Sequence, residues 1–136
     1  MEATTVLQSL VNVLFPTDIS LHFEVSMVQE YPDRIEIRME ELQELVPEKL
    51  YSKEEVVLDG FCNPLELQSF PLKGKPVYLK LYRRRWKEKG GNEHFSNIYD
   101  IHPDGVKATK DFASFLKESF GQSPDQYNSD CKIVMR

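Results

Sequence analysis

The chain has 136 residues, of which 40% are hydrophobic and 29% charged, and its formal net charge is −5 at pH 7. This size and composition fit one folded domain and exclude both a disordered chain and two ordinary domains. Two isolated cysteines, Cys62 and Cys131, predict neither a disulfide framework nor a four-ligand zinc site. We expect a soluble, cytoplasmic protein, because no stretch approaches the ~20 apolar residues of a membrane span and no signal peptide is recognisable.

The charges are distributed unevenly along the chain. Residues 1–70 contain 14 acids and 4 bases, whereas residues 71–136 contain 13 bases and 8 acids, so the two parts carry −10 and +5. Eight of the bases, and only one acid, Glu88, fall between residues 73 and 89. This concentration predicts a surface for an anionic partner that the whole-chain pI of about 5.2 would hide.

The N-terminal segment reads as a short amphipathic helix. Apolar residues recur at helical spacing over Thr4–Phe15, Pro16 ends the pattern, and Thr4 or Thr5 is a candidate cap. The apolar stripe could be a partner surface. We expect it instead to pack against a sheet, because a stripe of this width is normally buried.

Two alternating runs follow and predict a β-hairpin. They span His22–Gln29 and Arg34–Glu40, and Pro32 and Asp33 lie in the turn between them. Acids at every second position are what the solvated face of such a hairpin requires, so we prefer this interpretation to a metal site. An acidic loop over Glu41–Glu55 and two short strands near residues 56–61 and 65–70 complete this part of the chain.

The basic stretch contains an alternating strand over residues 77–86. Three aliphatic residues share the face expected in the core: Val77, Leu79 and Leu81. The opposite face interleaves cations with aromatic rings: Tyr78, Lys80, Tyr82, Arg84 and Trp86. Because Arg83 and Arg85 continue the apolar face, the strand must leave the core or bulge near Tyr82, and its last third should project as a basic finger.

A return strand over Glu93–Ile101 should complete a second hairpin spanning Val77–Ile101. His94 and His102 are interpreted as surface histidines, since no carboxylate or cysteine is spaced to join them in a site. A helix over residues 104–120 follows, with Asp104 or Thr109 as N-cap and Gly121 as C-cap. Residues 121–136 are expected to form a flexible tail.

Cations beside aromatic rings can neutralise phosphates and stack on bases, so the sequence predicts DNA binding through this stretch. The candidate residues are Lys73, Lys75, Lys80, Tyr82, Arg83, Arg84, Arg85, Trp86, Lys87 and Lys89. Two alternatives stay open: a solvated basic hairpin that protects a sheet edge, and a protein-interaction module that uses the oppositely charged halves. An enzyme is disfavoured, because no nucleophile with an adjacent base, phosphate loop or metal-ligand cluster can be read from the spacing.

Three motifs in order resemble a known family. FPLKGKPVYLK at residues 70–80, RRRW at 83–86 and TKDFASFLKE at 109–118 are similar to the N-terminal region of a family of bacterial insertion-sequence transposases, where this region is often a separate reading frame. The resemblance covers about residues 66–120. It extends distantly to transposases with a zinc-ribbon head, but Lys87 and Gly90 stand where a CxxCG knuckle has cysteines, which implies a degenerate, metal-free hairpin.

The resemblance implies a non-catalytic piece of a split transposase that binds duplex element ends and works with a separate catalytic subunit; the alternative is an interaction module or homo-oligomer without direct DNA binding. We expect no cofactor, no metal and no membrane partner.

The predicted fold is a single α+β domain over residues 1–120. It would contain an N-terminal helix, an antiparallel sheet of five or six strands and a longer C-terminal helix across the sheet.

Overall fold

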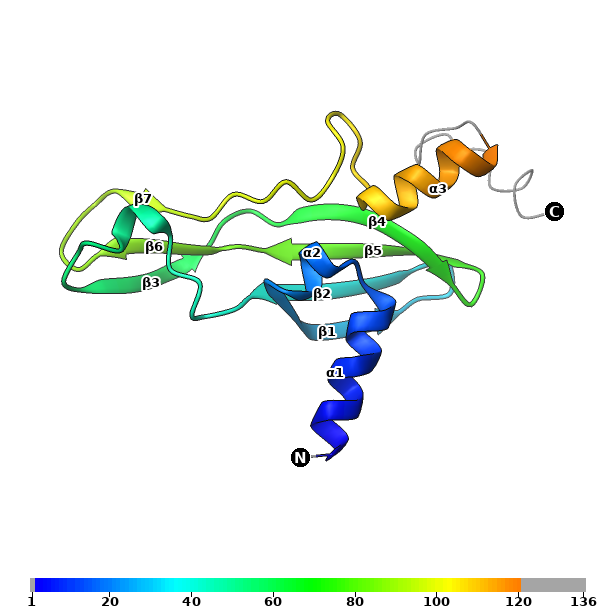
Figure 1. Cartoon of the computed structure of the whole chain (residues 1–136), viewed down its shortest axis with the longest axis horizontal. Coiled ribbons are helices and arrows are strands. Elements are labelled where there is room, and N and C mark those ends of the chain that lie inside the picture. Colours follow the sequence, from blue (N-terminus) through cyan, green and yellow to red (C-terminus); the bar gives the residue numbers. More distant parts are fainter. Residues whose placement is uncertain (1, 121–136) are drawn as a thin grey trace.

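The computed structural model describes residues 2–120, which form an α+β fold with two β-sheets (Figure 1). The helices are α1 (Glu2–Leu14), α2 (Thr17–Ser20) and α3 (Lys110–Phe120), with a short 3-10 helix, η1 (Glu48–Leu50). The strands are β1 (Phe23–Glu30), β2 (Ile35–Glu41), β3 (Val56–Phe61), β4 (Leu65–Leu72), β5 (Lys75–Tyr82), β6 (Arg84–Glu88) and β7 (His94–Phe95). One sheet has the order β1-β2-β5-β4 and the other β3-β6-β7.

The four-stranded sheet is mixed. The predicted first hairpin is confirmed, because β1 and β2 pair antiparallel, and β4 and β5 form a second antiparallel pair. Strands β2 and β5, however, run parallel at the centre of the sheet. The expectation of one antiparallel sheet of five or six strands was therefore wrong. The chain leaves β2, builds β3 in the other sheet and returns through β4, so it enters β5 in the same direction as β2.

The main core lies on one face of this sheet. Alternate residues of the two central strands are buried: Ile35, Ile37 and Met39 on β2, and Val77, Leu79 and Leu81 on β5. Phe15 and Ile19 at the start of the chain and Ile101 near its end belong to the same buried cluster. The period of two in the sequence thus identified the buried face of both strands.

The basic strand changes sheets at one residue. Strand β5 ends at Tyr82 in the four-stranded sheet, and β6 begins at Arg84 in the three-stranded sheet, so the predicted break is confirmed. The expected basic finger was wrong, because β6 is the middle strand of that sheet. The alternation slips by one position at Arg83. Consequently Arg84 and Trp86 are buried, and their predicted placement on the exposed face was wrong. β6 pairs with β3 on one side and with the very short β7 on the other, so the return strand is limited to His94–Phe95.

Helix α3 packs along β4. Phe112 and Leu116 are fully buried, and the ring centroids of Phe70 and Phe112 lie 5.2 Å apart. The helix begins at Lys110, and the Thr109 hydroxyl accepts a hydrogen bond from the Phe112 N–H at 3.3 Å, so Thr109 and not Asp104 is the cap of the two that were predicted. With 11 described residues it is not longer than the 13-residue α1. The expected Gly121 cap and the tail lie outside the described residues.

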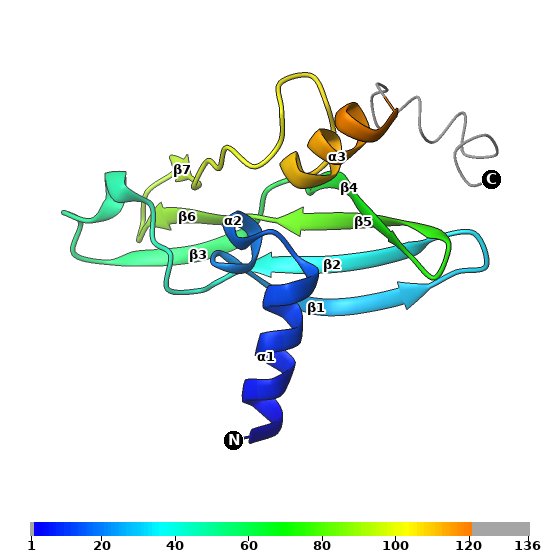
Figure 2. The ribbon, with the colours of Figure 1, turned by 45° about the vertical axis from the view of Figure 1, so that its right-hand side comes forward.

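Helix α1 extends away from the sheets (Figures 1 and 2). It begins at Glu2, so Thr4 and Thr5 lie inside the helix and are not its caps. The expected packing of its stripe is confirmed only for Val11, which contacts the main core, whereas the other large apolar side chains of the helix are exposed. Pro16 ends the helix, and Phe15 and Ile19 occupy the place over the sheet that the stripe was expected to fill. No helix in the described part of the chain is long and apolar enough to cross a membrane.

Candidate interaction surfaces

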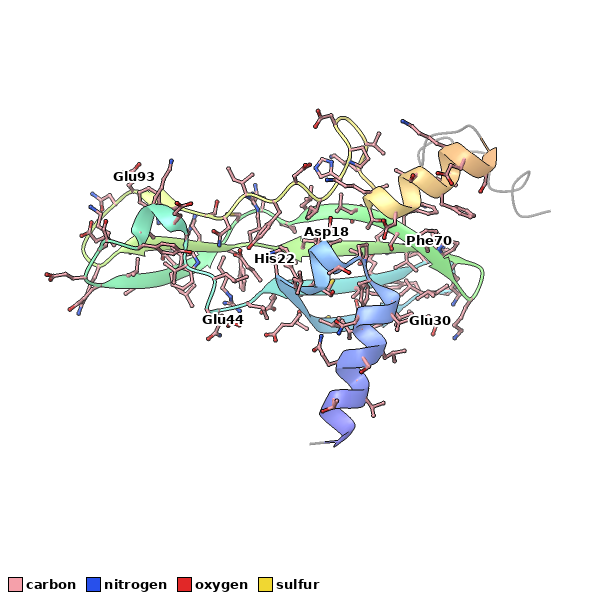
Figure 3. The ribbon with its side chains drawn as sticks, viewed as in Figure 1. Asp18, His22, Glu30, Glu44, Phe70 and Glu93 are labelled. Atoms are coloured by element: carbon pink, nitrogen blue, oxygen red, sulfur yellow. The ribbon has the colours of Figure 1, made fainter. Side chains whose placement is uncertain are left out.

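The basic stretch is enclosed by other strands, of which β2, β3 and most of β4 come from the acidic part of the chain. β5 lies between β2 and β4, and β6 lies between β3 and β7. Together β5 and β6 follow the long axis of the molecule, and Glu30 and Glu93 lie near its two ends (Figures 1 and 3). The eight bases are therefore spread along the molecule rather than gathered in one patch, and acidic neighbours accompany them.

The first two bases pair with a single carboxylate. The Nζ atoms of Lys73 and Lys75 lie 2.9 and 2.8 Å from Oε2 of Glu30. The hydrogen bonds from Lys75 and then Lys73 lower the pKa of Glu30 to about 2. Lys73 stands in the left-handed region with φ of 56°, directly before Gly74 in the β4–β5 turn. The turn thus brings both cations to the end of β1.

The middle of β5 is neutralised by β2. Lys80 Nζ lies 3.0 Å from Glu36, and Arg34 Nε lies 2.6 Å from the same carboxylate. The hydrogen bonds from Arg34 and Lys80 hold the pKa of Glu36 below its usual value. Tyr82 packs under a cation of the same sheet, since the Arg38 guanidinium lies 3.9 Å from its ring centroid. Neither Lys80 nor Tyr82 presents the open cation–aromatic surface that the sequence predicted.

The end of the basic stretch pairs with β3 and its preceding loop. Arg85 Nε donates to the carbonyl oxygen of Asp59 at 2.8 Å, and Lys89 Nζ lies 3.2 Å from Glu55. His94 contacts the Asp59 carboxylate, and this hydrogen bond is the main cause of a lowered Asp59 pKa. The zinc-ribbon character of this hairpin stays a prediction; the described residues contain no group of three or more His, Cys, Asp or Glu that could hold a metal.

Two of the eight bases differ from the others. No carboxylate among the described residues lies within 4.0 Å of Arg83 or Lys87; Arg83 Nη1 instead donates to the Asn97 carbonyl at 2.9 Å. Both side chains are half-buried. The cations that are free of ion pairs are therefore fewer than the sequence suggested.

Arg84 belongs to a buried network that the sequence reasoning missed. The Glu41 side chain is 0% exposed, and its Oε1 accepts from the Arg84 N–H at 2.7 Å. Its Oε2 accepts from Asn97 Nδ2 at 2.9 Å and from the Tyr99 hydroxyl. The Arg84 Nε donates to the Glu41 carbonyl at 2.6 Å, and Glu40 lies 3.7 Å from Nη2. This network joins the end of β2 to β6 and to the segment after β7.

Burial and the hydrogen bond to Glu41 raise the pKa of Tyr99, so its hydroxyl keeps its proton and remains a donor. One signal could have revealed the network: Glu41 continues the alternation of Ile35, Ile37 and Met39, so an acid stands at a core position of β2. Trp86 is also buried, and its Nε1–H has no hydrogen-bond partner among the described residues. Arg84 and Trp86 are thus structural residues.

The largest exposed apolar surface of a helix lies on α1. The α1 stripe consists of Val6, Leu7, Leu10, Val13 and Leu14, whose exposed fractions run from 43% for Leu14 to 81% for Val13. Beside it lies the α1–β1 groove, of about 440 Å³. The groove is lined by Leu7, Gln8, Val11, Ser20, Phe23, Glu24, Val25 and Leu42. Leu7 belongs to both, so the stripe and the groove form one continuous surface.

Comparisons of this chain with protein-family models, with curated proteins and with solved structures found no match.

Proposed function

We propose that this chain is a non-catalytic, protein-binding component of a split transposase, and that the α1 stripe is its docking surface. One observation carries the proposal. Five large apolar side chains are exposed on one helix, whereas six of the eight bases in residues 73–89 form ion pairs within the chain. Of the two functions considered from the sequence, protein binding therefore has the stronger support, but through the α1 stripe and not through the oppositely charged halves.

Burial of the α1 stripe would supply a substantial part of the free energy of docking. Its exposed fractions add up to about three fully exposed side chains. At about 1.5–3 kcal/mol for burying a Val or Leu side chain, covering the stripe would contribute roughly 5–9 kcal/mol. Association costs about 4–15 kcal/mol, so this contribution is the right size for a specific complex only when further contacts add to it. The adjoining groove offers such contacts, as in other complexes that place a helix in an apolar groove.

The role in transposition rests on the resemblance of residues 70–80, 83–86 and 109–118 to insertion-sequence transposases. In such a system a separate catalytic subunit would perform DNA cleavage and joining. A protein that assembles this machinery needs a docking surface rather than its own catalytic groups, and the α1 stripe supplies one.

In-cell photo-crosslinking tests this proposal. A photoreactive residue replaces Leu10 in the full chain, and the matched control carries it at Tyr51, which is 71% exposed but lies far from α1 in the sequence. We expect crosslinks from position 10, identified by mass spectrometry as this chain or the catalytic subunit, and few from position 51. Equal crosslinking from both positions, or none from position 10, would refute the docking role of α1.

Duplex DNA binding remains a second candidate, because of two observations. Arg83 and Lys87 have no carboxylate within ion-pair distance in the described chain, and Lys73 and Lys89 pair only through side chains that are 69% exposed. Exposed ion pairs contribute about 0–1 kcal/mol, so a phosphate could replace their carboxylates. These four cations could then contact DNA along β5 and β6.

The test is a titration of labelled duplex at several salt concentrations. Four phosphate contacts predict that log K falls with log salt with a slope of about −3 to −4. The informative variant is Arg83→Ala/Lys87→Ala, because Arg84→Ala would disturb the buried network instead. The control is Lys49→Ala/Lys53→Ala, which removes two bases outside the stretch. Equal affinity of both variants, or no binding at low salt, would reject this candidate.

A further inference from the structure

We propose that the partner of the α1 stripe is α1 of a second copy of this chain, in a two-fold dimer in which each stripe enters the α1–β1 groove of the other copy. This inference rests on the proposed docking function and names its partner. It follows from the placement of the stripe and the groove on one continuous surface, from the area they offer and from the absence of charge on the stripe.

The placement favours a reciprocal contact. A two-fold interface uses the same patch on both subunits and must therefore be complementary to itself. The α1–β1 groove begins at Leu7, a member of the stripe, and continues through Val11 to Phe23 and Val25 of β1. A protruding apolar helix and an apolar groove beside it are the two halves that such a contact needs. Figure 2 shows α1 standing clear of the sheets, where a second helix can approach it.

The area is adequate only when both copies contribute both surfaces. At about 25 cal/mol per Å², burying a Val or Leu side chain corresponds to about 60–120 Å². The stripe exposes about three such side chains, hence roughly 200–350 Å² per copy. A partner that contacts only one stripe would bury that stripe and a similar area of its own surface. A two-fold contact buries two stripes and the surfaces of the other copy that face them, about 800–1,400 Å² in total, which spans the ~1,000 Å² expected of a specific interface.

The charges permit self-association. Residues 5–14 contain no Asp, Glu, Lys or Arg, so two copies of the helix meet without like charges. Polar side chains on α1 are already hydrogen-bonded within the helix: Gln8 Nε2 donates to Asn12 Oδ1 at 3.1 Å, and Ser9 Oγ donates to the Thr5 carbonyl at 3.0 Å. Glu24 is the one charged residue that lines the groove, and it is exposed, as a rim residue is.

Sedimentation velocity of the full chain over a range of concentrations tests the dimer. We expect a monomer–dimer equilibrium that Leu10→Asp weakens about 100-fold, corresponding to about 10-fold for each of the two stripes. The matched control is Asn12→Asp, which adds the same charge on the opposite side of the same helix and should change the dimer constant less than 3-fold. Circular dichroism of both variants establishes that they fold.

Mixing experiments test the reciprocal geometry. In a dimer of one native chain and one Leu10→Asp chain, one stripe remains intact. The dissociation constant of this mixed dimer should therefore rise about 10-fold, which is the square root of the rise in the variant homodimer. A protein that is monomeric at all concentrations, or a dimer equally sensitive to Asn12→Asp and Leu10→Asp, would overturn the inference. A monomer that still crosslinks from position 10 to the catalytic subunit would overturn only the dimer and leave the docking function standing.

Discussion

The buried network around Glu41 gives the sharpest test of the fold. Glu41→Gln keeps the size of the side chain but removes the charge that three donors and the nearby Arg84 guanidinium require. The new amide also places an NH₂ group against at least one of these donors. Hydrogen bonds to a charged group contribute about 1.5–3 kcal/mol each, and a buried donor left without an acceptor costs about 1–3 kcal/mol more.

We therefore expect the loss of these hydrogen bonds in Glu41→Gln to lower the free energy of unfolding by about 3–5 kcal/mol, a large part of the 5–15 kcal/mol of a typical domain. Urea denaturation at neutral pH measures this loss, which corresponds to a shift in midpoint of about 2 M when the denaturant slope is about 2 kcal/mol per M. The control is Glu66→Gln on β4. Glu66 is exposed, and no base among the described residues lies within ion-pair distance of it, so its loss should stay below about 1 kcal/mol.

Similar losses in the two variants would mean that the charge of Glu41 contributes no more to stability than that of a surface carboxylate. They would also remove the basis for treating Arg84 as a structural residue, and Arg84 would return to the set of candidate DNA contacts.

Three further predictions concern single side chains. The carboxyl of Glu30 should titrate near pH 2 by NMR, and the midpoint should rise in Lys75→Ala or Lys73→Ala. Because the fold lowers the pKa of Glu30, the ionised carboxylate stabilises the protein above pH 4.5, and this stabilisation is lost toward pH 2. An unchanged midpoint in both variants would contradict the ion pairs. The fold raises the pKa of Tyr99, so the protonated hydroxyl stabilises the protein below pH 10, and this stabilisation is lost as the pH rises further. The free energy of unfolding in urea should therefore decline above pH 10, and Tyr99→Phe should reduce this decline. Trp86→Phe should lower the free energy of unfolding by less than about 1.5 kcal/mol in the same assay, because it removes a buried N–H that has no acceptor. A decrease above about 3 kcal/mol would indicate a hydrogen bond of Trp86 that the structure does not contain.

Local patterns in the sequence identified much of the secondary structure. The alternation in β2 and β5 predicted both strands and their buried faces, because side chains on a strand point to opposite sides with a period of two. The change at Arg83 was also readable, since three consecutive arginines cannot continue an apolar face. The register after this change was not, because a slip of one residue reverses the faces and leaves no trace in composition.

Pairing between distant segments could not be read in this way. The parallel contact of β2 with β5 depends on the path of the chain through residues 42–72, and no local pattern records it. The same contact decides the meaning of the basic stretch. Its charges are a property of the sequence, but their neutralisation by Glu30, Glu36 and the carboxylates near β3 depends on which strands become neighbours.

The sequence by itself determined that this chain forms an α+β domain with a cationic central strand and an apolar N-terminal helix. Only the tertiary structure decided that six of the eight cations of Lys73–Lys89 pair with acidic neighbours and that the α1 stripe faces water. The physical reason is that burial and ion pairing are contacts between segments far apart in the chain, whereas periodicity and charge are properties of a single segment.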